Sequence, residues 1–172
     1  MNAQQTHPGT SATSPMAAAS IPVHSSAFES NQSIPVRYTC QGDNISPALS
    51  WGAAPSGAKS FALLCEDPDA PRGTFIHWVM YNIPPTETGL VENVPQLATL
   101  PNGAKQGMNG AGKIGYKGPC PPTGKPHRYY FRLYAVGEML NLSGDVTRDL
   151  LMAAIQGHVV GMGELMGTYQ RN

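Results

Sequence analysis

Charged residues are scarce in this sequence, and the two signs balance. They make up 13% of the 172 residues, with eleven lysines and arginines against eleven aspartates and glutamates, so the formal net charge is zero. No block of Lys or Arg occurs along the chain. Proteins that bind nucleic acid carry basic stripes that neutralise phosphates. The sequence therefore excludes a nucleic-acid-binding surface of that kind.

Cysteine is scarce as well. The three residues, Cys40, Cys65 and Cys120, are odd in number and show no C-x-x-C spacing. Neither a zinc site nor a complete disulfide framework is indicated by such a pattern. We expect reduced, mostly buried thiols. A single Cys40–Cys120 bridge stays open as an alternative, because spacing alone does not decide it.

Long apolar runs are lacking too. The longest, Leu150 to Ile155, is too short to cross a membrane. The first 28 residues hold no Lys, Arg, Asp or Glu, and they lack the basic start and apolar core of a signal peptide. We therefore expect a cytoplasmic protein. Residues 1–20, rich in Ser, Thr, Ala, Gln and Pro without periodicity, are predicted to be a disordered arm, and residues 21–172 a single domain.

Glycine and proline, by contrast, are abundant, with nineteen and sixteen residues. This composition favours short strands joined by turns, and therefore an all-β protein with few helices. Apolar runs bounded by turn residues predict strands at 59–66, 75–83, 127–136 and 163–170. Thr147 as N-cap and Gly157 after the last turn predict a helix over 148–156. Residues 86–116 are glycine-rich and weakly patterned, which indicates a long excursion of loops that walls a pocket or contacts a partner.

Alternation in the two central strands assigns their side chains to faces. In strand 127–136, His127 and Tyr129 fall on the same side. In strand 75–83, one face is predicted to carry Phe75, His77, Val79, Tyr81 and Ile83, and the other Ile76, Trp78, Met80 and Asn82. Because neither face of this second strand is clearly polar, it is predicted to lie at the centre of a sandwich.

Two rigid loops each deliver a histidine into a strand. The first, with Pro68 and Pro71, holds Asp67 and Asp69 on a non-helical turn ahead of His77. The second runs from Gly118 through a series of prolines to His127. A lone His in an apolar strand is more often a core residue than a ligand group. The repeated design favours instead one small polar pocket where the two loops meet.

The residue types in these loops suit an anion. A carboxylate near an imidazole favours its protonated form, and backbone N–H groups of a loop such as the one at Gly118 can point at an anion. Tyr129 would add a hydroxyl donor and Phe75 an apolar wall. Asp43 and Asn44, in a Gly-Asp-Asn turn, could also face the pocket, although a turn held by its own side chains is the more ordinary interpretation of Asp43.

Several blocks of sequence resemble the phosphatidylethanolamine-binding protein family, and in particular its bacterial and archaeal Raf-kinase-inhibitor-like branch. They are Asp67-Pro68-Asp69-Ala70-Pro71, His77-Trp78-Val79-Met80-Tyr81-Asn82-Ile83-Pro84, and Gly118-Pro119-Cys120-Pro121-Pro122 through His127-Arg128-Tyr129. Gly42-Asp43-Asn44-Ile45-Ser46-Pro47 and the segment from Gly157 to Tyr169 are similar to the same branch.

This resemblance implies a β-sandwich with a large central antiparallel sheet, a smaller second sheet and one or two short helices, often as a homodimer. It also implies a pocket for phosphate or a phosphorylated small molecule or lipid head group, and a regulatory role such as inhibition of a kinase or protease. The residues carried into the pocket are Asp67, His77, His127 and Tyr129. Pro71, Gly118 and Pro119 would shape it, and Asp69 would support it. Phe75 stands where the family often has Trp.

An enzyme is the alternative hypothesis. A Cys120 thiolate beside His127 could act as a nucleophile, and His77, His127 and Asp67 could form a two-histidine, one-carboxylate metal site. No helix N-terminus or basic cluster is evident near Cys120 to lower its pKa. A histidine that a carboxylate keeps charged cannot bind a metal. We therefore expect a non-enzymatic binding protein without a cofactor.

Overall fold

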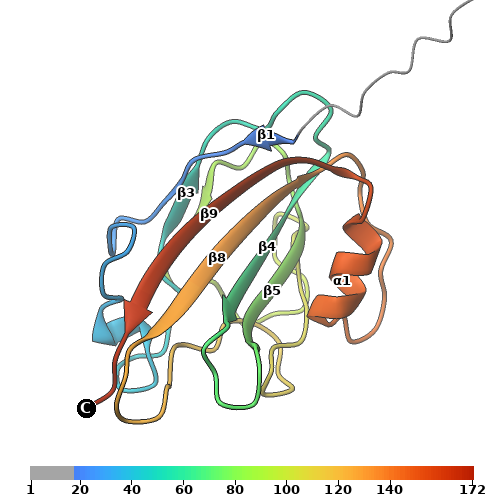
Figure 1. Cartoon of the computed structure of the whole chain (residues 1–172). Coiled ribbons are helices and arrows are strands. Elements are labelled where there is room, and N and C mark those ends of the chain that lie inside the picture. The colour runs from blue at the N-terminus through green and yellow to red at the C-terminus, as the bar shows by residue number, and fades with distance from the viewer. Residues whose placement is uncertain (1–17) are drawn as a thin grey trace, which may run out of the picture.

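Two β-sheets and one helix make up the part of the chain that the computed structural model describes, residues 18–172. The six-stranded sheet has the order β1-β9-β8-β4-β5-β7, and its long strands lie side by side (Figure 1). It consists of β1 (Ala19–Ser20), β9 (Val159–Tyr169), β8 (His127–Val136), β4 (Ser60–Asp67), β5 (Phe75–Ile83) and β7 (Lys105–Gln106). All of its neighbours pair antiparallel except β1, which pairs parallel with β9.

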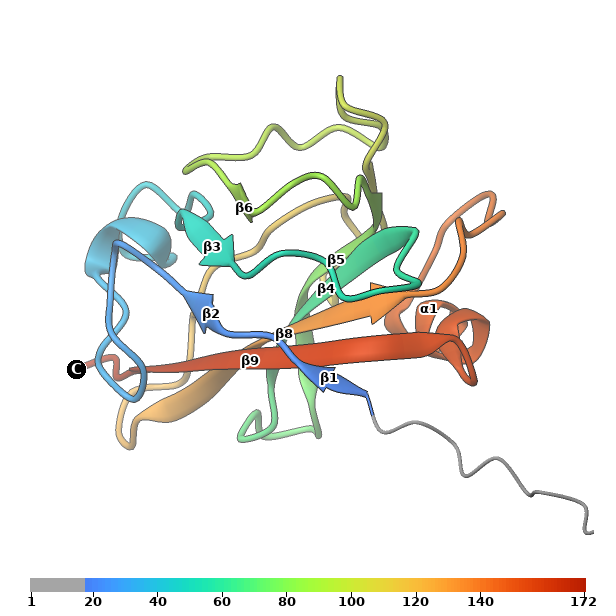
Figure 2. The ribbon, with the colours of Figure 1, turned by 90° about the horizontal axis from the view of Figure 1, so that it is seen from above.

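A three-stranded sheet lies over one face of the large sheet (Figure 2). It consists of β2 (Val23–His24), β3 (Leu49–Trp51) and β6 (Gly89–Leu90). A 3-10 helix, η1 (Val36–Tyr38), and one α-helix, α1 (Arg148–Ile155), complete the elements. The predicted β-dominated sandwich is therefore confirmed.

Most of the predicted elements occur close to their predicted limits. β5 and β8 have the predicted limits, β4 is displaced by one residue, and α1 is capped by the Thr147 side chain, which accepts a hydrogen bond from the Leu150 N–H. The last strand begins earlier than predicted, at Val159. The glycines in this strand weaken its sequence pattern, so its first residues were not predicted. Gly163 is nevertheless needed, because a Cβ there would lie 2.0 Å from the Ile21 carbonyl oxygen. The excursion 86–116 is mostly loop and contributes only β6 and β7.

The large sheet separates two apolar cores. The core beneath the small sheet takes Tyr129, Phe131, Leu133 and Ala135 from β8, whereas the core beneath α1 takes Tyr134 and Val136. The predicted alternation of β8 is confirmed. Leu151 and Ile155 of α1 pack into the second core. Both faces of the sheet are thus covered, which explains why the central strands are apolar on both sides.

The predicted faces of β5 are wrong. His77 packs against Tyr129 and Trp78 against Tyr116, so two consecutive residues point into the same core. The register between β4 and β5 shifts between Cys65 and Glu66, as expected for a β-bulge, and shifts again further along. A bulge inserts an extra residue and re-aims side chains. As a result Val79 and Tyr81 lie in the core beneath α1 and not on the side of His77.

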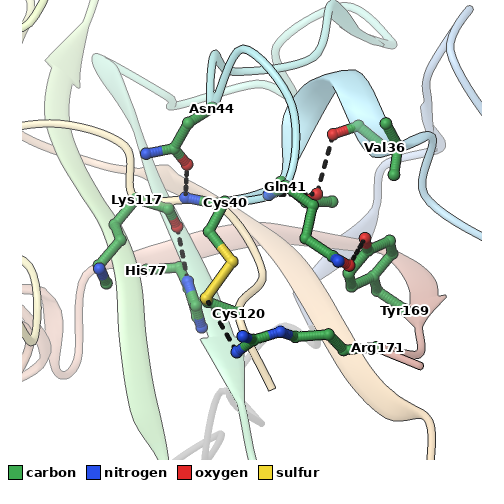
Figure 3. The surroundings of a disulfide bond; sticks show 11 residues. Val36, Cys40, Gln41, Asn44, His77, Lys117, Cys120, Tyr169 and Arg171 are labelled. Carbon is green, nitrogen blue, oxygen red and sulfur yellow. Dashed lines mark hydrogen bonds between the residues drawn. A yellow bond between two sulfur atoms is a disulfide. The ribbon is translucent and has the colours of Figure 1, made fainter. Parts of the chain in front are cut away.

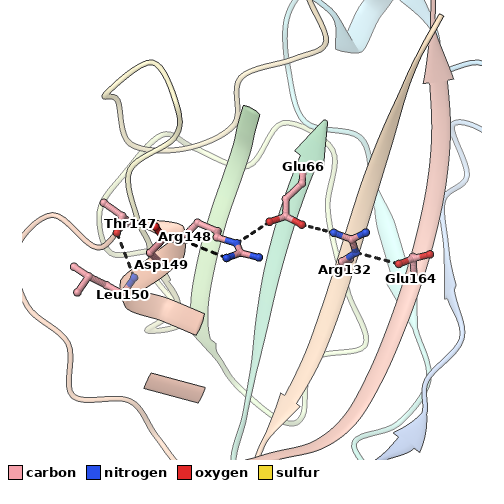
Figure 4. Close-up of polar contacts among 7 residues, drawn as sticks. All are labelled: Glu66, Arg132, Thr147, Arg148, Asp149, Leu150 and Glu164. Atoms are coloured by element: carbon pink, nitrogen blue, oxygen red, sulfur yellow. Dashed lines mark hydrogen bonds and ion pairs between the residues drawn. The ribbon is translucent and has the colours of Figure 1, made fainter. Parts of the chain in front are cut away.

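Beneath α1 a buried carboxylate is held by two guanidinium groups (Figure 4). Glu66 accepts hydrogen bonds from Arg148 Nε, at 2.9 Å, and from Arg132 Nη1. Each arginine also contacts a second carboxylate, Glu164 for Arg132 and Asp149 for Arg148. Charge is therefore neutralised locally on this face of the sheet, and the cluster ties α1 to β4 and β8.

The segment before η1 runs along the outer edge of β9. Ala19 and Ser20 form β1, and further on the N–H groups of Ile21, Asn31 and Ile34 each donate to a β9 carbonyl at 2.7 Å. Residues 1–17 of the predicted arm 1–20 lie outside the described residues. The last two residues of the arm, Ala19 and Ser20, belong to the sheet. Among residues 18–172, no helix combines the length and apolar character needed to cross a membrane.

Candidate functional site

A small cavity lies where β4 ends, β5 begins and β8 begins. Its volume is about 140 Å³. Both predicted loops contribute to its wall, which is formed by Asp67, Ala70, Pro71, Phe75, His77, Lys117, Cys120, Pro121, Pro122, His127 and Tyr129. Six of the nine predicted site residues therefore meet there. The wall comes from two stretches far apart in sequence, 67–77 and 117–129, which the pairing of β4 with β5 and β8 brings together.

Asp67 and His127 form a hydrogen-bonded pair on one side of the cavity. His127 Nδ1 donates to Asp67 Oδ2 at 2.7 Å, and Asp67 Oδ1 accepts from the Asp69 N–H at 2.8 Å. The Asp67 side chain is only 4% exposed and that of His127 12%. The buried carboxylate thus fixes the ring of His127 and leaves its Nε2 free of the pair.

His77 is tied to the opposite loop at Lys117 (Figure 3). Its Nδ1 donates to the Lys117 carbonyl at 2.6 Å, and its own carbonyl accepts from the Lys117 N–H at 2.9 Å. Burial lowers the pKa of His77 to about 4, which outweighs the opposing effects of the Lys117 carbonyl and the Asp67 charge. The expected protonated imidazole is therefore not present at this position near pH 7. Desolvation of the ring overrides the neighbouring carboxylate.

Tyr129 contributes a hydroxyl without a partner. Its side chain is fully buried, and its hydroxyl is the one buried side-chain N or O atom without a hydrogen bond among residues 18–172. Burial, with the Asp67 charge, raises the pKa of Tyr129 well above its ordinary value, so the phenol remains protonated. An orphaned buried hydroxyl costs free energy, and one that lines a cavity is available to a ligand.

A disulfide joins Cys40 to Cys120 (Figure 3), and Cys120 lines the cavity. The Cα atoms lie 5.4 Å apart, within the range that a bridge requires. The expectation of reduced thiols is wrong for these two residues and confirmed for Cys65, which is free and buried. Spacing could not show the bridge, because the two cysteines are separated by 80 residues and only the fold brings them together.

Backbone contacts next to the disulfide hold the Gly/Pro loop against the segment after η1. The Gly118 N–H donates to Asn44 Oδ1 at 2.8 Å, and the Cys40 N–H donates to the Pro119 carbonyl at 3.0 Å. Asn44 adopts a left-handed conformation with φ of 57°. A Cβ at position 118 would lie 2.3 Å from the Tyr38 carbonyl oxygen, so only glycine fits there. Asn44 thus supports the cavity wall, whereas Asp43 is exposed and pairs with Arg37.

Three predicted site residues lie outside the wall. Gly118 and Pro119 act through the contacts just described, and the Gly118 N–H is already bonded to Asn44, so it does not face an anion. Asp69 is paired with Arg128 through two side-chain hydrogen bonds, at 2.8 and 2.9 Å. These hydrogen bonds lower the pKa of Asp69 to about 2. The sequence did not single out Ala70, Lys117, Pro121 and Pro122 as wall residues, although all four flank or lie within the two predicted loops.

The opposite face of the sheet has a larger hollow, of about 470 Å³, beside the N-terminus of α1. Its charged lining includes Glu66, Arg132 and Arg148, and both arginines already form ion pairs with Glu66. The smaller cavity is the better candidate site, because it combines two histidines with an unpaired hydroxyl.

The comparisons with known proteins agree with the motifs. A sequence profile of the family described as phosphatidylethanolamine-binding protein matches residues 24–170. The chain belongs to this family. It is 52% identical over 145 residues to a UPF0098 protein of Methanothermobacter thermautotrophicus, which covers 84% of this chain and 95% of that protein. A UPF0098 protein of Chlamydia muridarum is 45% identical over 153 residues, 86% of this chain and 97% of that protein.

Two solved structures of family members share the fold. A phosphatidylethanolamine-binding protein homologue of Chlamydia trachomatis matches with a TM-score of 0.81 and 41% identity, over 90% of this chain and all of that one. YbcL of Escherichia coli, described as a member of the mammalian family, matches with a TM-score of 0.82 and 31% identity, over 88% of this chain and 99% of that one. The relation therefore spans nearly all of the described residues.

The two enzymatic alternatives meet obstacles in the geometry. Cys120 is oxidised and has no thiolate to offer. Asp67 is engaged with His127 and the Asp69 N–H, and no group of three or more His, Cys, Asp or Glu residues within 18–172 is arranged to hold a metal ion.

Proposed function

We propose that this protein is a non-enzymatic binding module whose cavity takes a small phosphate-like anion, either free or as the phosphorylated group of a small molecule or lipid head group. The observation that carries the proposal is the Tyr129 hydroxyl, buried without a partner in a cavity that it shares with two histidine rings. The nearby Asp67 carboxylate, already bonded to His127 and to the Asp69 N–H, does not reach hydrogen-bond distance of this hydroxyl, so a ligand with an acceptor atom would supply the missing partner. His127, aligned by Asp67, would supply a charge-assisted bond when its ring is protonated.

The proposal extends to regulation. Occupancy of the cavity would alter the exposed Pro-rich loops around it, which would form the contact with a protein partner, a kinase or protease. Family resemblance supports this partner class, as it does a homodimer. The cytoplasmic location stays a prediction, and the disulfide favours an oxidising compartment instead.

Calorimetric titration with inorganic phosphate and with O-phosphorylethanolamine tests the anion site. We expect binding to wild type and a loss of about 1.5–3 kcal/mol for His127→Ala, the contribution of a hydrogen bond to a charged group. His158→Ala is the matched control, because His158 is exposed and pairs with Glu138 away from the cavity. If neither probe binds to the wild-type protein at every pH tested between 5 and 8, the proposal is refuted.

A further inference from the structure

The hydrogen-bond pattern of His77 determines what a ligand meets on that side of the cavity. The Lys117 carbonyl can only accept, so Nδ1 of His77 must carry the proton in the 2.6 Å contact between them. A neutral imidazole carries one N–H. Nε2, on the far edge of the ring from Lys117 in Figure 3, therefore presents a lone pair and no hydrogen.

The second histidine has the same tautomer. The Asp67 carboxylate fixes the proton of His127 on Nδ1, so its Nε2 donates only when the ring is charged. The Tyr129 hydroxyl is the donor that is present at every pH near neutrality, because burial raises its pKa. The cavity of the neutral protein thus offers more lone pairs than hydrogens. This is a poor match for an anion that carries no proton.

Charged and titratable groups surround His77 from each neighbouring element. Asp67 at the end of β4 favours the charged ring, Lys117 in the loop opposes it, and Tyr129 of β8 contacts the ring at a centroid distance of 5.2 Å. His127, also on β8, shares the cavity. Burial dominates over these influences, with the pKa of His77 lowered to about 4. The lone pair at Nε2 is therefore the normal state near pH 7.

We propose that the cavity selects oxyanions that bring their own proton, so that it takes monoprotonated phosphate monoesters and rejects sulfate and phosphodiesters. The inference rests on the proposed anion site and specifies its ligand class. The P–OH hydrogen would be donated to His77 Nε2, and the remaining oxygens would accept from the Tyr129 hydroxyl and from His127 Nε2 when protonated. Sulfate and a phosphodiester carry no such hydrogen near neutral pH, so they would require a proton on the buried His77 ring first.

The test is a calorimetric comparison of four probes on wild-type protein between pH 5.5 and 8: inorganic phosphate, O-phosphorylethanolamine, sulfate and dimethyl phosphate. We expect both phosphate probes to bind at least tenfold more tightly than sulfate and dimethyl phosphate at pH 6. Above the second pKa of O-phosphorylethanolamine, near 6, the affinity of this probe should fall up to about tenfold per pH unit, because its dianion has no P–OH hydrogen. Inorganic phosphate should keep its affinity over this range, because its dianion still carries one P–OH hydrogen. Repeating the O-phosphorylethanolamine titration at pH 7.5 in buffers of different ionisation enthalpy should reveal uptake of a proton on binding, and inorganic phosphate should show no such uptake.

Two variants of the same residue sharpen the test. His77→Gln places an amide near the position of Nε2, which can turn its NH₂ group to the cavity, so sulfate should bind and the pH dependence should weaken. His77→Asn keeps a donor near the position of Nδ1 for Lys117 but removes the acceptor, so the preference for phosphate over sulfate should disappear. The wild-type comparison stands alone if either variant fails to fold.

The possible results separate the two proposals. Equal binding of all four probes without proton uptake would overturn this inference and leave the anion site intact. Binding of dimethyl phosphate in preference to O-phosphorylethanolamine would overturn it also, and would indicate a lipid phosphodiester as ligand. If none of the probes binds, the anion site itself is refuted.

Discussion

Two adjacent carboxylates, Glu66 and Asp67, lie on opposite faces of β4, and their partners differ: arginines for Glu66 and a histidine for Asp67. Glu66 is held between two guanidinium groups, whose charge does not change at any physiological pH. Asp67 is held by the imidazole of His127, whose second ring nitrogen stays free of the pair. The first arrangement is suited to fixing α1 against the sheet, and the second leaves a polar atom for a ligand.

The two faces also differ in how completely their polar groups are paired. The Glu66 cluster is closed, since each arginine bridges two carboxylates. The Asp67 face retains the unpaired hydroxyl of Tyr129. A buried polar group that lowers the stability of the fold and forms no hydrogen bond within it is expected at a functional site. The comparison therefore separates charge that stabilises the fold from polarity that the proposed ligand would use.

The largest effect is expected from breaking the cavity wall at the disulfide. Cys40→Ser combined with Cys120→Ser removes a bridge across 80 residues, and this should lower the free energy of unfolding by about 4 kcal/mol in the chain-entropy account. Denaturant unfolding measures the loss. Anion affinity should fall as well, because Cys120 lines the cavity. Reductant should lower the unfolding free energy and the anion affinity of wild type, and it should change neither quantity in the double variant. In Cys65→Ala, which keeps the disulfide, reductant should have the same effect as in wild type.

The next effect should come from the opposite face. Glu66→Ala leaves Arg132 and Arg148 without their shared buried partner, and breaking a buried ion pair costs about 3–5 kcal/mol. We expect the lower value, about 3 kcal/mol, because each arginine keeps a second carboxylate. Thermal or chemical unfolding checks the loss, and calorimetry should show unchanged anion affinity. A tenfold weaker affinity in Glu66→Ala would show that the two faces are coupled.

Lowering the pH should destabilise the fold through His77, on the cavity face of the sheet. The pKa of His77 is lowered from 6.5 to about 4 in the folded protein, so between these values the unfolded chain binds more protons. His77 therefore stabilises the fold fully above pH 6.5, and this contribution is lost as the pH falls toward 4, by about 2–3 kcal/mol. Unfolding measured from pH 7 to pH 4 should show this decline, and His77→Gln should flatten it. An equally steep decline in the variant would contradict the assignment.

The smallest effect on stability should have the opposite sign. Tyr129→Phe removes a buried hydroxyl that has no partner, so the free energy of unfolding should rise by about 1 kcal/mol or stay unchanged. Anion affinity should fall about tenfold, the value of one hydrogen bond. Tyr134→Phe, on the α1 face of the same strand, is the control and should leave anion affinity unchanged. Unchanged affinity in Tyr129→Phe would remove the hydroxyl from the site.

Much of the architecture could be predicted because it depends on local patterns. β8 alternates strictly, and α1 is marked by Thr147 at its start and Gly157, with φ of 80°, after its end. The cavity was predicted from the recurrence of a rigid loop before each histidine. These signals lie within a few residues of the features they predict, so one sequence is enough to find them.

The failures share a different cause, since each depends on contacts made by tertiary structure. The bulge that turns His77 and Trp78 to the same side arises from the pairing of β4 with β5, and no residue type in β5 predicts it. The disulfide depends on the approach of two distant loops. The low pKa of His77 depends on how deeply the ring is buried, which composition and spacing do not reveal.

The parallel strand β1 and the segment that follows it bear on how the protein behaves at high concentration. β9, with eleven residues, would otherwise present a long row of open backbone groups, and such an edge is a template for association with other chains. Ala19, Ser20 and the later N–H donors occupy that edge at intervals. These short contacts cover the edge against pairing with other chains. A variant beginning at Val23 loses β1 and the Ile21 contact, so it should self-associate through the part of β9 around Gly161 and Met162, although Asn31 and Ile34 still cover the far end.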